Sequence, residues 1–310
     1  MTTRELIEDS VKKYGFMFFG LFILLSVSIG TGIGELLSKI IFKNTFNMQN
    51  VSLLASNHDA CNYMKFSQAV GAISLFIIAP IVLGLFNREL MKSWGFNNKI
   101  NVKLLYFLPL TMILAIPFIN FTAMINEMMK MPSFLSGIEK WMLQSEADNK
   151  ILTDAFLSSI TIKGLLLNVF IMAVIPAIGE ELFFRGAIQS LFQKFIKNHH
   201  IAIFLTAFLF SAIHMQFYGF IPRFLMGLFF GYLFYWSKSL WLPILAHFTN
   251  NFVAVIFTYL GNAKAVTSAP ENIGSSGNDW IGILISILLT GFLIFYIWRN
   301  IQDENRTIRH

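Results

Sequence analysis

Apolar stretches long enough to cross a bilayer recur along the whole chain. A spanning helix needs about 20 mostly apolar residues. Eight stretches meet this requirement: roughly 14–37, 66–86, 104–125, 164–193, 201–219, 221–237, 239–260 and 279–298. Hydrophobic residues make up 55% of the 310 positions and charged residues only 13%, which is outside the range of soluble domains. The sequence therefore predicts an all-α, polytopic membrane protein with about eight transmembrane helices.

The charged residues indicate how these helices cross the membrane. Basic residues crowd the connection 88–103, whereas the connection 126–160 carries five acidic residues against three lysines. Because basic loops stay in the cytoplasm, we expect both termini in the cytoplasm of a cell-membrane protein. The net charge of +6 then reflects topology, and nucleic acid is not an expected partner. The single cysteine, Cys61, excludes an intramolecular disulfide.

The chain divides into four segments. Residues 1–130 are expected to form about three transmembrane helices, and 131–160 an outer connection with a helix along the membrane interface. Residues 161–260 contain the polar residues described below. Residues 261–310 are expected to form a flexible outer loop rich in Gly, Ser, Asn and Pro, a last transmembrane helix and a cytoplasmic tail.

Ionisable groups at membrane depth are costly and require a reason. The stretch "AIGEELFFRGAIQSLF" carries Glu180, Glu181 and Arg185. In one long helix, Glu181 and Arg185 share a face and can neutralise each other. Glu180 then points about 100° away and is left to face a cavity, as a general base would. The alternative is that all three groups merely form a packing salt bridge.

Two later helices supply further polar groups. His214 ends the run "FLFSAIH", and His247 and Asn251 lie four residues apart in "LAHFTNNF". Each feature alone is as well explained by hydrogen bonding between helices, as are Asn250 and Arg223. At about 1.5 Å per residue, however, Glu180, His214 and Asn251 each lie roughly 20 Å from the inner loops, and His247 roughly 13 Å. We therefore expect these groups to meet in one site.

The segments "EELFFR", "FSAIH" and "HFTNN" resemble, in order, the three motifs of the CPBP family of CAAX proteases and bacteriocin-processing proteins, also called the ABI family. This family includes the type II CAAX prenyl endopeptidases. The resemblance covers about residues 160 to 260. It implies that Glu180 activates a water held with the help of His214. It further implies that His247 and Asn251 stabilise the oxyanion, and that Glu181 and Arg185 are a structural pair.

Zinc is an alternative, since one carboxylate and two imidazoles are suitable ligands. No HExxH sequence is present, and a base opposite hydrogen-bond donors can act without a metal, so no cofactor is expected. The leading hypothesis is an intramembrane endopeptidase acting on a membrane-associated or lipidated peptide. The alternatives are a non-catalytic membrane factor, such as an immunity protein, that binds peptides in the same cavity, and a proton-coupled transporter. The transporter is disfavoured because the sequence shows no inverted repeat.

Overall fold

The computed structural model describes residues 20, 28, 30, 32–43, 57–264 and 279–307, and within these ranges all regular structure is helical. After a helix at 32–42 come α3 His58–Ala72, η1 Ile73–Ile78, α4 Ala79–Phe86, α5 Arg88–Ser93, α6 Leu104–Leu114, α7 Ile116–Glu127, η2 Ser133–Leu135 and α8 Ser136–Leu157. The second half contains α9 Ile162–Val169, η3 Phe170–Val174, α10 Ile175–Glu181, η4 Leu182–Gln189, α11 Ser190–Phe195, α12 His199–Ala212, η5 Phe217–Gly219, α13 Phe220–Ser237, α14 Trp241–Asn262 and α15 Trp280–Thr307. The all-α class is confirmed.

Five of the described helical runs are long and apolar enough to cross a membrane: His58–Phe86, Ile162–Phe195, Phe217–Ser237, Trp241–Asn262 and Trp280–Glu304. A sixth span is obtained if α6 and α7 are counted together, although they are bent by 41°. The bend lies next to Pro117, which has no backbone N–H to donate and stands in the first turn of α7. The protein is thus a multi-pass membrane protein.

The expected count of eight spans is not reached in the described residues. The stretch 201–219 forms α12, whose 14 residues are fewer than a span needs, followed by a turn and η5. Hydropathy overestimated this stretch because it continues through the turn at Met215, where φ is 54°. Most of the first expected span, 14–37, and the loop at 265–278 lie outside the described residues.

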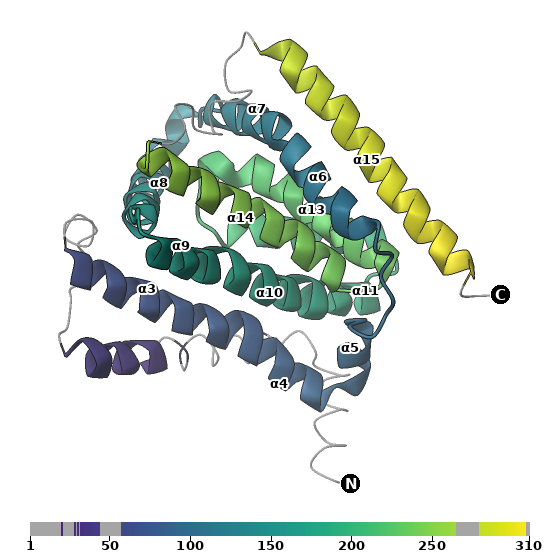
Figure 1. Cartoon of the computed structure of the whole chain (residues 1–310), viewed down its shortest axis with the longest axis horizontal. Coiled ribbons are helices and arrows are strands. Elements are labelled where there is room, and N and C mark those ends of the chain that lie inside the picture. The colour runs from purple at the N-terminus through teal and green to yellow at the C-terminus, as the bar shows by residue number, and fades with distance from the viewer. Residues whose placement is uncertain are drawn as a thin grey trace.

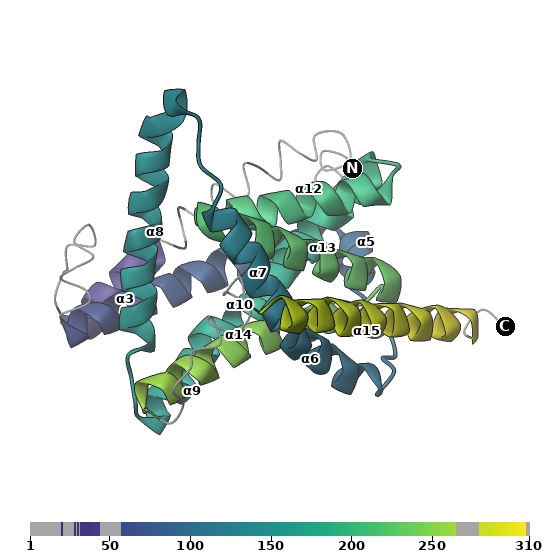
Figure 2. The same ribbon diagram turned by 90° about the horizontal axis from the view of Figure 1, so that it is seen from above.

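The helices form a bundle around the run Ile162–Phe195 (Figure 1). The run α3 to α4 packs along one side of it and α14 along the other, while α15 lies against α6 at the edge. A core cluster joins α6, α13, α14 and α15 through residues such as Leu108, Phe230, Leu242 and Ile297. In Figure 2, α8 stands across the direction of α15 at one end of the bundle.

The run Ile162–Phe195 is helical throughout and does not break at Gly179 or Gly186. It contains two π-helical segments, η3 and η4. Such wider turns are rare and often occur at functional sites. Continuity keeps Glu180, Glu181 and Arg185 on one rigid element, as the spacing requires.

The connection after α13 is tied to the connection after α5. Lys238 ends α13 in the left-handed conformation, at φ 52°. Asn98 Nδ2 donates to its carbonyl oxygen at 2.7 Å, and the backbone N–H of Leu240 donates to the Trp94 carbonyl oxygen at 2.9 Å. Gly95, at φ 63°, lies so close to the Lys238 carbonyl oxygen that a Cβ on this residue would overlap it. These contacts fix where α14 begins and therefore also the position of His247 on it.

Candidate active site

Glu180 lies near the end of α10 with its carboxylate inside the bundle. Its side chain is 13% exposed, and Oε2 is buried without a hydrogen-bond partner in the protein. His214 Nε2 lies 3.8 Å and His247 Nε2 lies 3.9 Å from this oxygen. These distances exceed a direct hydrogen bond but allow a bridging water. The helix α10, the turn after α12 and the helix α14 thus bring together the carboxylate and both imidazoles.

His214 is oriented by the carbonyl oxygen one turn before it. The distance between His214 Nδ1 and the Phe210 carbonyl oxygen is 2.7 Å. Because a carbonyl oxygen only accepts hydrogen bonds, Nδ1 carries the proton. In the neutral ring, Nε2 therefore presents a lone pair towards Glu180.

Glu181 connects Arg185 to His247. Arg185 Nη1 donates to Glu181 Oε1 at 2.9 Å, and both side chains are fully buried. His247 Nδ1 lies 2.8 Å from the same oxygen. Since a carboxylate accepts, His247 Nδ1 donates, and its Nε2 is directed towards Glu180. The pair expected from the i, i+4 spacing is present, and it also orients an imidazole, which spacing within one helix did not indicate.

Aromatic rings enclose the Arg185 and His247 side chains. The Arg185 guanidinium carbon lies 4.6 Å from the centre of the Phe210 ring and 5.4 Å from that of Phe230. Phe230 stacks on His247 with a centroid distance of 5.2 Å and an angle of 19°. The rings exclude water from the Arg185 cation, whose Nη2 also donates to the Gly227 carbonyl oxygen at 3.0 Å.

Sequence reasoning missed the part of α13 that supports this cluster. Gly227 and Gly231 let α13 approach η4 and α12, since a Cβ on Gly231 would lie 2.8 Å from Ile203 Cγ2. Their carbonyl oxygens accept hydrogen bonds from Arg185 and Gln189. The signal was available as a G-x-x-x-G spacing in an apolar helix, which is typical of close helix packing in membranes.

Asn251 lies one turn beyond His247 on α14, on the same face of the helix. Its side chain is half-buried, and its Oδ1 accepts a hydrogen bond from Asn250 Nδ2 at 3.2 Å. Asn251 therefore shares a helical face with His247. Asn250 lies on the neighbouring face of α14 and orients the Asn251 amide through this hydrogen bond.

Arg223 lies at the edge of the site, near the start of α13. Its Nη1 donates to the Gln216 carbonyl oxygen at 3.0 Å, and its charge acts on Glu180 and on Glu146 of α8. A Cβ on Gly219 would overlap the guanidinium. Sequence analysis noted this arginine among the polar residues of the spans but assigned it no role.

No group of three or more His, Cys, Asp and Glu side chains within the described ranges is arranged to hold a metal ion. The zinc alternative therefore has no ready-made ligand set among these residues.

Residues 162–253 match the family model described as type II CAAX prenyl endopeptidase Rce1-like. This segment, which is less than half of the chain, is similar to the Rce1-like family. The family is named for endopeptidases, and the matched range contains Glu180, Glu181, Arg185, His214, His247 and Asn251. The resemblance to the CAAX protease family inferred from three short motifs is confirmed.

The chain is also similar to a curated protein, the membrane-embedded CAAX protease MroQ of Staphylococcus aureus (strain USA300). The two chains are 33% identical over 109 residues, which is 33% of this chain and 43% of the relative. The similarity thus spans less than half of either protein. No solved structure matches the chain.

Proposed function

We propose that the protein is an intramembrane endopeptidase that hydrolyses a peptide bond of a membrane-associated or lipidated substrate. The observation that supports this most is the convergence of Glu180 Oε2 with the Nε2 atoms of His214 and His247. A buried carboxylate that faces two imidazoles without a hydrogen-bond donor from the protein destabilises the fold, so stability does not explain it. The same arrangement is suited to binding and activating a water.

Glu180 and His214 act together on the attacking water. One water hydrogen is donated to Glu180 Oε2 and the other to the lone pair of His214 Nε2, which leaves an oxygen lone pair for the scissile carbonyl carbon. Glu180 takes the proton as the carbon–oxygen bond forms. It then returns the proton to the leaving nitrogen as the carbon–nitrogen bond breaks.

His247 and Asn251 stabilise the oxyanion of the tetrahedral intermediate. Because Nδ1 of His247 donates to Glu181, its Nε2 can donate only when the ring is an imidazolium. The charges of Glu180, Glu181, Arg185 and His247 balance in that state, which favours it in a buried site. The Asn251 amide supplies the second donor.

The substrate class follows from where the site lies. The catalytic groups belong to membrane-spanning runs and to the turn after α12, so a peptide held at the membrane can reach them more readily than a soluble one. The relative is named a CAAX protease and the family is named for prenyl endopeptidases. A lipidated peptide is therefore the first substrate to test. Both termini of the enzyme are expected in the cytoplasm.

We expect His247→Gln and Asn251→Ala to lower kcat for cleavage of a lipidated peptide in liposomes by about 10²–10³-fold each. KM should change little, because the oxyanion exists only after the substrate is bound. Thr258→Ala, further along α14, is the control and should behave as wild type. Undiminished cleavage by His247→Gln contradicts the oxyanion role. Binding without cleavage by the wild type, across a broad peptide set, favours the non-catalytic peptide-binding protein instead.

We also expect cleavage to be independent of zinc. Protein purified without added metal should contain far less than one zinc per chain, and a chelator should leave the rate of peptide cleavage unchanged. Elemental analysis of the same sample tests this. Stoichiometric zinc, with activity lost on chelation and restored on readdition, would overturn the metal-free mechanism.

A further inference from the structure

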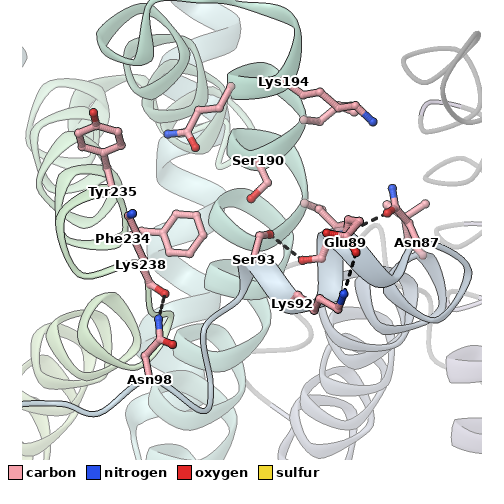
Figure 3. A pocket seen from close by; sticks show the side chains of 15 residues that line it. Asn87, Glu89, Lys92, Ser93, Asn98, Ser190, Lys194, Phe234, Tyr235 and Lys238 are labelled. Atoms are coloured by element: carbon pink, nitrogen blue, oxygen red, sulfur yellow. Dashed lines mark hydrogen bonds and ion pairs between the residues drawn. The ribbon is translucent and has the colours of Figure 1, made fainter. Parts of the chain in front are cut away.

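A cavity lies away from the candidate active site, at the end of the bundle where α4, α11 and α13 finish (Figure 3). It has a volume of about 690 Å³ and is lined partly by Ala187, Ser190 and Lys194. Ser190 is about 15 Å along the helix from Glu180 at 1.5 Å per residue. The cavity is therefore separate from the catalytic groups, and its size is in the range of small-molecule sites.

The cavity carries a positive charge that the protein does not neutralise. Lys92, Lys194 and Lys238 line it with one carboxylate, Glu89, so the ionisable lining sums to +2. Glu89 is occupied by Lys92 at 2.8 Å. Within the part of the chain that the structure describes, Lys194 and Lys238 have no carboxylate at ion-pair distance. In Figure 3, Lys238 lies across the pocket from Lys92 and Lys194.

Gln193 supplies an unused donor in the same wall. Its Nε2 is buried and has no hydrogen-bond partner in the protein. A buried amide nitrogen without an acceptor is unfavourable unless a ligand supplies one. Across the cavity, Asn98 Nδ2 donates to the carbonyl oxygen of Lys238 and so fixes the backbone from which this lysine side chain extends. The lining is therefore suited to a negatively charged ligand that is rich in hydrogen-bond acceptors.

The surroundings of this cavity have the composition of a membrane–water interface. Next to it, Trp94, Phe96 and Trp241 form an aromatic cluster with ring centroids 6.2 and 5.2 Å apart. Trp and Tyr gather at the level of lipid headgroups. The exposed Phe86 and Phe195 flank the lining residues along the chain, and Leu191 and Phe234 form part of the wall. A ligand suited to this lining has a charged end among the lysines and an apolar end against apolar side chains.

We propose that this cavity binds the phosphate headgroup of an anionic phospholipid from the leaflet on the side of the basic connections. Lys194, Lys238 and Gln193 Nε2 donate to the phosphate oxygens. The glycerol and the first acyl carbons lie against Leu191 and Phe234. Basic pockets between membrane helices are suited to such headgroups.

The experiment measures lipid retained by the full-length protein in detergent by native mass spectrometry. Phosphatidylglycerol and phosphatidylcholine with the same acyl chains are the probes, and inorganic phosphate is the competitor. We expect phosphatidylglycerol to be retained at least about 10-fold better than phosphatidylcholine. Lys194→Gln combined with Lys238→Gln should weaken it about 30-fold, since each lysine near an anionic lipid contributes about 1 kcal/mol.

Two further variants make the result specific to the cavity. Leu90→Trp should fill it and weaken retention without changing charge. Lys140→Gln combined with Lys150→Gln, on α8, removes the same charge elsewhere and should have no effect. Equal retention of both lipids, or unchanged phosphatidylglycerol binding in the Lys194 and Lys238 double variant, overturns the proposal. Displacement of the lipid by inorganic phosphate at similar concentration identifies a free-anion site and overturns the lipid assignment.

Discussion

Glu180→Gln should lower the rate of peptide cleavage by about 10²–10⁴-fold, the contribution of a general base, while the protein stays folded. Glutamine has nearly the same shape but cannot accept the proton of the attacking water. No hydrogen bond within the protein is lost, because Glu180 Oε2 has no such partner. Thermal unfolding in detergent should therefore occur at the wild-type temperature or slightly above it, since a buried charge has been removed.

The matched control is Glu139→Gln, which removes a carboxylate on α8 far along the chain from the site. Its cleavage rate should equal that of the wild type. Wild-type activity in Glu180→Gln would exclude Glu180 as the base. A large fall in unfolding temperature would instead show that Glu180 acts through structure.

Unlike Glu180→Gln, Arg185→Met should destabilise the protein, by about 3–5 kcal/mol, because removing one partner leaves the other buried charge uncompensated. Glu181 would keep only His247 as a partner for Oε1. The Gly227 carbonyl oxygen would also lose its donor. Activity should fall as well, since His247 is oriented through Glu181. The measurement is the thermal unfolding temperature of the variant in detergent.

The protein contains a suitable control for this prediction. Lys92 and Glu89 form an ion pair of nearly the same length, 2.8 Å, but their side chains are 72% and 83% exposed. Lys92→Met should not change the unfolding temperature measurably, because exposed pairs are solvated and screened. Combining Glu181→Gln with Arg185→Met should restore part of the lost stability, since neither charge is then left alone. An Arg185→Met protein as stable as the wild type would contradict the structural role of the pair.

How far the sequence could predict the site is clear from individual residues. The i, i+4 spacing of Glu181 and Arg185 predicted an ion pair, since both residues lie on one helix with a known period. Depth counting from the loops placed Glu180 and His214 at the same level, and their side chains do meet. The contact between Glu181 and His247 could not be predicted, because it depends on the relative rotation of α10 and α14 and not on depth.

The number of membrane spans was overestimated from the sequence. Hydropathy detects apolar residues but not where a helix ends, and α12 ends at Ala212 within an apolar stretch. The turn that follows is held from outside the stretch, since Asn126 Nδ2 donates to the Phe217 carbonyl oxygen and the Ile221 N–H donates to Asn126 Oδ1. These bonds join residues about 90 positions apart, which no local pattern records.

The sequence alone determined the fold class and the identity of the candidate catalytic groups. Both follow from local properties, namely the length of apolar runs and the high cost of ionisable residues within them. The tertiary structure decided which nitrogen of each imidazole faces Glu180, how α13 approaches Arg185 through Gly227 and Gly231, and that three lysines share one cavity. These features depend on how separate helices pack against one another, and packing is set by side chains that are distant in sequence.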